Sequence, residues 1–124
     1  MDLNKVLLIG IVAYEPDVYA TKGSTPMVTL KLLVVEKWRD RGGEERETKN
    51  YFPITAFGET AEYIQHEVHK GDRLKIVDGK LFMRQINSDD PKSRWEMRVK
   101  ALKVESLDTR DDDGISMPKI DLPF

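Results

Sequence analysis

Residues 4–13 hold a nearly continuous apolar run rather than an alternating one, and the strand that they predict is apolar on both faces. The two faces hold, in turn, Val6, Leu8 and Val12, and Leu7, Ile9 and Ile11. A strand that is apolar on both faces is buried on both. Because a chain of 124 residues makes only one small domain, we expect a second subunit to cover one of these faces.

In two other segments apolar and polar residues alternate, which gives each predicted strand one apolar and one more polar face. In residues 27–38 one face holds Val28, Leu30, Leu32 and Val34. In residues 48–57 one face holds Phe52, Ile54 and Ala56. Both patterns predict strands with one face toward a core, joined by a charged, glycine-containing loop. Pro53 cannot donate a ladder hydrogen bond, so the third strand should be at an edge or bulged there.

Residues 58–72 carry a helical spacing. The apolar residues that recur at this spacing are Ala61, Ile64 and Val68. They predict a helix with one face on the core. We expect it to begin at Gly58 or Thr60 and to end at Lys70-Gly71.

Two strands are expected after the helix, at residues 73–85, with a kink at Gly79, and at residues 94–105. Three strands, one helix and two strands are the order of an all-β fold, the five-stranded OB-fold Greek-key barrel with one helix between strands 3 and 4. We therefore assign residues 1–105 to an OB-fold domain. Residues 106–124 are polar, acidic and aperiodic, which predicts a disordered or loosely attached tail.

Charge is divided unevenly between these two parts. Residues 105–124 carry six acidic and two basic side chains, a net charge of −4, whereas the rest carries 16 acidic and 18 basic ones, a net charge of +2. This asymmetry indicates a body that meets an anion and a tail that does not. The chain has no cysteine, which excludes disulfides and thiolate sites. No signal peptide or membrane span is evident, so we expect a cytoplasmic, nucleoid-associated protein.

Catalytic patterns are weak in this sequence. His66 and His69, with Glu62 one turn earlier, could be metal ligands, but the spacing is not that of a known helical zinc site and a solvated helix face is the favoured interpretation. Serine and threonine residues have no triad setting, and Gly42-Gly43 lies in a hairpin rather than in a phosphate loop. We expect no enzyme activity, metal or cofactor, with a metal-dependent nuclease as a remote alternative.

Aromatic side chains beside cations favour binding to single-stranded nucleic acid, because bases stack on aromatic rings while cations follow the phosphates. The candidate stacking residues are Trp38, Tyr51, Phe57 and Phe82, and the candidate cations are Lys37, Arg39, Lys49, Lys80 and Arg84. The alternative is that these aromatics cap the core or line a subunit interface. Trp95 shares its face with Met97, Val99 and Ala101, and is expected in the core or in an interface.

Several segments in order make the chain resemble the bacterial single-stranded DNA-binding proteins. They are NKVLLIG, EPDV, Trp38-Arg39-Asp40, AFG followed by Ala61-Glu62, HKGDRLKIVDGKL, and the C-terminal IDLPF. The resemblance implies an OB-fold, often a homotetramer, that wraps single-stranded DNA. It places family stacking positions at Trp38, Tyr51 and Phe57, with Tyr51 where the family usually has Trp.

Three departures from the family pattern change these expectations. A fourth stacking Trp falls at Ile86, which cannot stack comparably, so Phe82 is a partial replacement. Pro53 stands where a basic residue is common in the family, which removes one phosphate contact. The linker before the tip is short, and Lys119 interrupts its acidity.

The combined hypothesis is a non-enzymatic single-stranded DNA-binding protein of replication, recombination and repair, assembled as a homotetramer or homodimer. The tip Asp121, Leu122, Pro123 and Phe124 resembles the family's docking peptide for replication and repair proteins, although it could instead pack on its own barrel. The alternatives are a dimeric primosomal paralog of the same fold and an OB-fold adaptor that binds only protein.

Overall fold

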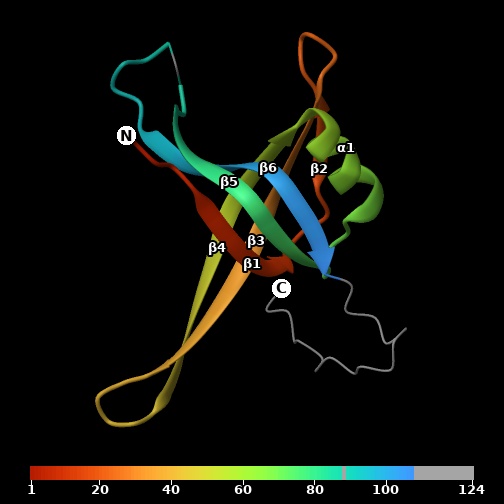
Figure 1. The fold of residues 1–124 in the computed structure, drawn as a ribbon. Coiled ribbons are helices and arrows are strands. Elements are labelled where there is room, and N and C mark those ends of the chain that lie inside the picture. Colours follow the sequence, from red (N-terminus) through yellow and green to blue (C-terminus); the bar gives the residue numbers. More distant parts are fainter. Residues whose placement is uncertain (88, 108–124) are drawn as a thin grey trace.

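The computed structural model describes residues 1–87 and 89–107, and within them the chain forms six strands and one helix (Figure 1). In order they are β1 (Val6–Val12), β2 (Asp17–Ala20), β3 (Pro26–Arg39), β4 (Glu45–Phe57), α1 (Gly58–Glu67), β5 (Arg73–Gln85) and β6 (Trp95–Leu107). The five predicted strands and the helix are confirmed. β6 continues to Leu107, two residues beyond the expected end of the barrel.

Five strands close into a barrel in the order β1-β5-β6-β4-β3, and β1 joins its two ends. β1 pairs first with β5, as Leu8 with Ile76, and then with β3, as Ile11 with Leu33. Gly10 lies where β1 changes partner, and a Cβ atom there would collide with the carbonyl oxygen of Leu33. Glycine at this position therefore lets β1 approach β3 closely enough to close the barrel.

The interior of the barrel holds the predicted apolar faces. Its buried residues are Val12, Val28, Leu30, Leu32, Ile54, Ala56, Ala61, Ile64, Val68, Leu74, Ile76, Val99 and Ala101. α1 packs against β3, β4 and β6 and contributes Ala61 and Ile64 of its predicted helical stripe, and Val68 follows directly after the helix. Within the described residues, no helix has both the length and the apolar run that crossing a bilayer requires.

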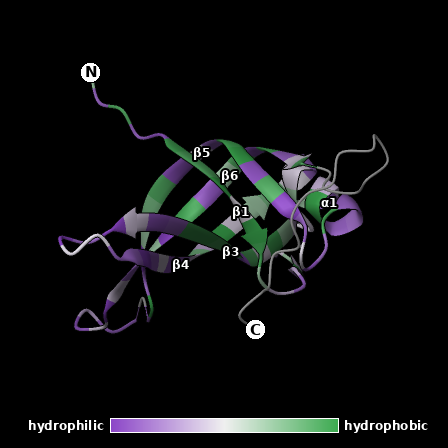
Figure 2. Cartoon of the chain, turned by 90° about the horizontal axis from the view of Figure 1, so that it is seen from below, coloured by the Kyte–Doolittle hydropathy of each residue, from purple (hydrophilic) through white to green (hydrophobic). Residues whose placement is uncertain are grey.

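β1 is hydrophobic along its length, as Figure 2 shows by its colour, and part of this apolar surface is exposed. Leu7 is 63% exposed and Ile9 is 48% exposed on the single chain. Ile11, which we expected on the same side, is buried beside Leu33. A partner subunit over Leu7 and Ile9 therefore stays a prediction, and Ile11 needs none to be buried.

One strand was not predicted, and the predicted end of the helix was wrong. Residues 17–20 form a short strand, β2, and they pair with β3 from Asp17–Thr29 to Ala20–Pro26. All four residues are exposed, so they carry no buried face to detect. The helix ends at Glu67, three residues before Lys70, since Val68 is already extended.

The prediction for Pro53 is confirmed only in part, since β4 lies between β3 and β6 and has no bulge at Pro53. Pro53 pairs only with Lys31 of β3, because β6 joins β4 only at Ile54 and Thr55. The carbonyl of Lys31 accepts from the Ala13 amide on its other side, so the Lys31–Pro53 pair carries no ladder hydrogen bond. The missing amide hydrogen of Pro53 therefore removes no hydrogen bond between β3 and β4.

The kink predicted at Gly79 is also confirmed. The register of β5 against β6 shifts on both sides of Asp78, which marks a bulge at this point of the strand. A Cβ atom at Gly79 would lie 3.0 Å from Cγ2 of Ile76. The pairing of β5 with β6 is therefore irregular at the predicted position.

Candidate nucleic-acid interface

Cations and aromatic rings gather on the side of β5 and β6 that faces away from the core. In the register of these strands, Lys80 lies opposite Lys100 and Phe82 lies opposite Arg98. Residues opposite each other share a face, so these four and Arg84, two residues after Phe82, lie on one side. The predicted grouping of Phe82 with Lys80 and Arg84 is thus present.

The third strand of this surface is β4, which runs parallel to β6. Thr55 pairs with Lys100, and the guanidinium Nε of Arg98 donates to Thr55 Oγ1 at 3.0 Å. The ammonium of Lys100 lies 5.4 Å from the centroid of the Phe57 ring, a cation–π distance. We call the set Phe57, Lys80, Phe82, Arg84, Arg98 and Lys100 the basic face.

One carboxylate interrupts the basic face. Glu96 accepts a hydrogen bond from Arg98 Nη1 at 2.8 Å. This bond, with the charges of Arg98, Arg84 and Lys31, holds the pKa of Glu96 below its ordinary value despite some desolvation. The pair fixes the Arg98 side chain, which is only 15% exposed, and leaves the face with an excess of positive charge.

Tyr51 and Lys49 lie farther along the same outer side of β4. They are opposite Leu33 and Val35 of β3, and Tyr51 keeps 39% of its surface exposed. Both are an even number of positions from Phe57 along β4, so all three side chains lie on the same face. The predicted row of Lys49, Tyr51 and Phe57 is therefore present, and it runs from the basic face toward the arm. The arm is the part of the β3–β4 hairpin beyond the barrel, residues 35–49, and it begins after Val34, which still packs against the core (Figure 1).

Trp38 lies near the end of this arm, on the opposite side from Tyr51. It pairs with Arg46, and its indole Nε1 donates to Thr48 Oγ1 at 2.9 Å across the hairpin. Half of its surface, 51%, is exposed. The structure therefore separates Trp38 from the basic face. A single strand of DNA would have to follow the twist of the long two-stranded arm to contact both.

The two cations predicted beside Trp38 meet acids on the facing strand. Lys37 is opposite Glu47, and Arg39 Nη2 lies 3.8 Å from Glu45. Such exposed pairs are weak, with a typical value of about 0–1 kcal/mol. Lys37 and Arg39 therefore stay accessible to phosphates, but they are not part of the basic face.

Asp40 organises the loop that ends the arm. Its carboxylate accepts hydrogen bonds from Arg46 Nε and from the amides of Gly42 and Glu44, at 2.9–3.0 Å. The bond to Arg46 is the largest cause that lowers the pKa of Asp40, and the backbone bonds add to it. These contacts give the tip of the arm a defined shape beside Trp38.

Trp95 is not in the core, which corrects one half of its predicted placement. It shares the parity of Val99 and Ala101, as expected, but the β5–β6 hairpin continues past the barrel and leaves Trp95 59% exposed. Met97 and Met83, which pair on the same side, are also exposed. An interface role for Trp95 stays a prediction.

Lys31, Arg98 and Lys100 were not among the predicted site residues. Arg98 and Lys100 alternate with the buried Val99 and Ala101, and this alternation is the signal that could have placed them on an outer face. Their proximity to β4 had no such signal, since it follows from the parallel β4–β6 pairing.

His66, on α1, and His69, after its end, stand apart from this surface. Across residues 1–87 and 89–107, no three His, Asp or Glu side chains gather closely enough to hold a metal ion. His69 Nδ1 lies 3.6 Å from Glu15, whose other carboxylate oxygen accepts from the amide of Lys70. The predicted docking residues Asp121, Leu122, Pro123 and Phe124 lie outside the described residues.

Comparison with known proteins identifies the family. Residues 3–107 match the Single-strand binding protein family. The chain belongs to this family. The family resemblance noted in the sequence is therefore confirmed over the whole barrel.

Relatives in this family differ in length. A single-stranded DNA-binding protein of Deinococcus radiodurans is 31% identical over 105 residues, which are 85% of this chain and 34% of that protein. The Thermotoga maritima protein of the same name is 29% identical over 113 residues, 91% of this chain and 79% of the relative. The chain thus spans about a third of the Deinococcus relative.

Solved structures of the family confirm the OB-fold barrel. A Plasmodium falciparum SSB in complex with ssDNA superposes with a TM-score of 0.78 at 26% identity, over 87% of this chain and 97% of that one. A deletion mutant of the single-stranded DNA binding protein from Thermus aquaticus gives 0.77 at 31% identity, over 88% and 52%.

Proposed function

We propose that this protein binds single-stranded DNA without catalysis, along the outer side of β5, β6 and β4 and onward to the arm. The observation that carries the proposal is the basic face, where Phe57 and Phe82 stand among four cations on three adjacent strands. Bases would stack on these two rings and on Tyr51, and phosphates would meet Lys80, Arg84 and Lys100. Trp38 would engage the strand farther along.

The physical chemistry of the basic face fits a sequence-tolerant binder. An exposed aromatic ring can stack on any base, and such a contact is worth about 1–3 kcal/mol by alanine substitution. Each cation that neutralises a phosphate of a single strand contributes about −0.7 to the slope of affinity against salt on logarithmic axes. Membership of the family and the fold shared with a structure solved with ssDNA support the same assignment.

The wider role is part of the proposal. We infer a cytoplasmic protein of DNA replication, recombination and repair that assembles as a homotetramer or homodimer through the apolar side of β1. The residues from Asp121 to Phe124 would recruit partner proteins, because a terminal apolar ring, a proline and flanking carboxylates suit a shallow pocket with a basic rim. A primosomal paralog would share the barrel and differ in its partners.

Tryptophan fluorescence tests the binding directly, because the chain has two Trp residues and both Trp38 and Trp95 are about half exposed. Titration with oligo-dT should quench the emission, and a double-stranded oligonucleotide of equal length should quench it far less. The variant Trp38→Phe shows which part of the quenching comes from the arm. Light scattering on the same samples reports the mass of the assembly.

An adaptor that binds only protein gives a different result. It would show no quenching and no change in light scattering at any oligo-dT concentration at moderate salt, and this outcome would contradict the proposed function. Cleavage of the oligonucleotide that depends on added divalent metal would instead identify the nuclease alternative.

A further inference from the structure

One carboxylate, Glu96, lies among the cations of the basic face. It is opposite Arg84 in the register of β5 and β6, and it accepts a hydrogen bond from Arg98, two residues later on β6. This bond, with the charges of Arg84 and Lys31, holds the pKa of its carboxyl below the ordinary value, so the group is ionised at neutral pH. A carboxylate that is surrounded by cations takes the kind of position that a DNA phosphate would take.

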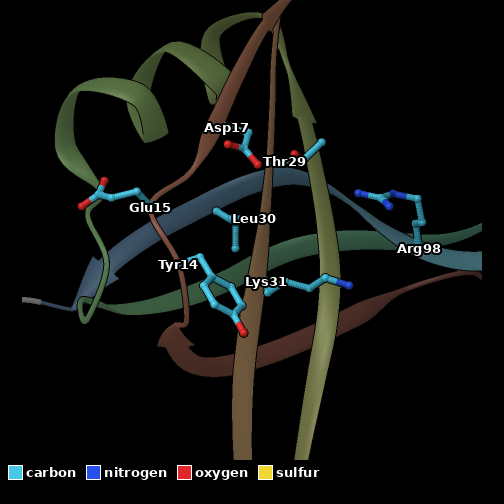
Figure 3. Close-up of a pocket in the computed structure, with 7 residues that line it drawn as sticks. All are labelled: Tyr14, Glu15, Asp17, Thr29, Leu30, Lys31 and Arg98. Carbon is cyan, nitrogen blue, oxygen red and sulfur yellow. The ribbon is translucent and has the colours of Figure 1, made fainter. Parts of the chain in front are cut away.

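The bond between Glu96 and Arg98 is short and partly shielded from water. Arg98 Nη1 lies 2.8 Å from Glu96 Oε1, and the two side chains are 15% and 35% exposed. Arg98 Nε also donates to Thr55, and Figure 3, a close-up of the hollow beside this face, shows the guanidinium turned toward β4. Opposite charges attract more strongly where water is partly excluded. Glu96 therefore compensates the charge of Arg98 and weakens its attraction for a phosphate.

A phosphate that reaches Arg98 has to take the place of Glu96, because a guanidinium donates to carboxylates and phosphates through the same N–H groups. The exchange replaces one charge-assisted hydrogen bond with another, and it leaves the carboxylate without its donor beside a negatively charged strand. The net gain from such a contact is small. Lys80 and Lys100 form no ion pair within residues 1–87 and 89–107, so they can bind phosphates without this exchange.

We infer that Glu96 is a built-in competitor for DNA phosphate, which holds Arg98 neutralised, lowers the affinity of the basic face and speeds the release of the strand. The inference rests on the proposed function and assigns to Glu96 the effect opposite to that of the cations around it. Differences in affinity between variants of one interface are mostly differences in dissociation rate. Because only the phosphates of the DNA are involved, the competition leaves the tolerance for base sequence unchanged.

The variant Glu96→Gln tests this role. It removes the charge but keeps a side-chain oxygen that can accept from Arg98, so the hydrogen bond between the two side chains can be retained. Glu62→Gln is the control, because it makes the same change of charge on the exposed side of α1. Affinity for labelled oligo-dT is measured by anisotropy across a salt series, and the dissociation rate by stopped flow with excess unlabelled oligo-dT. Circular dichroism and a thermal melt report the fold of each variant.

We expect Glu96→Gln to bind oligo-dT about fivefold more tightly or better at low salt, with dissociation slower by a similar factor. Its salt slope should be steeper by about 0.7, since one more cation meets a phosphate. It should melt at a lower temperature than the parent, because the shielded charge of Arg98 is then uncompensated. A variant that melts lower but binds like the parent would show that the pair is only structural, and would overturn the inference. Glu62→Gln should bind like the parent.

The double variant Glu96→Gln/Arg98→Gln identifies the cation that gains the phosphate. If Arg98 binds it, the salt slope of the double variant is shallower than that of Glu96→Gln by about 0.7. Equal slopes for these two variants would mean that Glu96 acts only by general repulsion, and would overturn the competition for Arg98. A parent that binds no oligo-dT at moderate salt would contradict the proposed function itself.

Discussion

Removing the ring of Phe57 is the most direct test of the basic face. Phe57 is the last residue of β4, its side chain points outward, and its ring is 38% exposed with Lys100 Nζ at 5.4 Å. In Phe57→Ala the ring is lost while the extended backbone that precedes α1 is kept. The substitution therefore separates the function of the ring from the packing of the barrel.

The expected magnitudes differ for stability and for binding. Since Phe57 is outside the core cluster, the fold loses mainly a surface cation–π contact of about 0.5–1 kcal/mol and part of the ring's burial. Binding loses one stacked base, about 1–3 kcal/mol, which weakens affinity by roughly tenfold at about 1.4 kcal/mol per decade. Phe57→Tyr keeps the ring and should restore most of the affinity.

The measurement is the anisotropy of labelled oligo-dT at moderate salt, beside a thermal melt of each variant. Tyr63→Ala is the matched control, because Tyr63 has the same exposure, 38%, but lies on α1. We expect Trp38→Ala to weaken binding to a similar extent through the arm. Folded Phe57→Ala and Trp38→Ala variants that bind like the parent would refute the proposed path of the DNA.

Three further changes test the assembly, the course of the phosphates and the tail. Ile9→Lys puts a charge on the exposed apolar side of β1, and light scattering should give a lower mass than for the parent; a parent that is already monomeric at micromolar concentration contradicts this interface. Pro53→Arg adds a cation between Lys31 and Arg98 and should steepen the salt slope by about 0.7; an unchanged slope would mean that position 53 does not meet the backbone of the DNA. Deleting residues 121–124 should leave the melting temperature unchanged and single-stranded DNA affinity equal or slightly higher, and should abolish capture of replication or repair enzymes from a host extract. A large fall in melting temperature would show instead that the tip packs on its own barrel.

The alternation of side chains was enough to predict most of the core. Val28, Leu30 and Leu32, and on the next segment Ile54 and Ala56, are all buried on one face as their period of two required. This part of the structure is local, because successive side chains of any strand point to opposite sides wherever the strand lies. The helix could be predicted from the spacing of its own apolar residues, because this pattern is local as well.

Segments without a buried face could not be predicted from the alternation of apolar and polar residues. β2 was missed because its four residues are all exposed, and its identity as a strand depends on its pairing with β3. Trp95 was placed on the correct side but at the wrong depth, since the β5–β6 hairpin extends beyond the barrel that would have covered it. Alternation reports the direction of a side chain, whereas burial depends on what the fold puts over it.

The candidate site shows the same division. The sequence by itself determined that Phe57, Phe82, Lys80 and Arg84 lie on outward faces of their strands. Only the tertiary structure put these strands side by side, through a parallel β4–β6 ladder in which Arg98 bonds Thr55, a residue 43 positions earlier. Strand pairing joins distant residues through backbone hydrogen bonds that every sequence offers alike, so the neighbours of a strand are fixed by closure of the barrel rather than by its own residues.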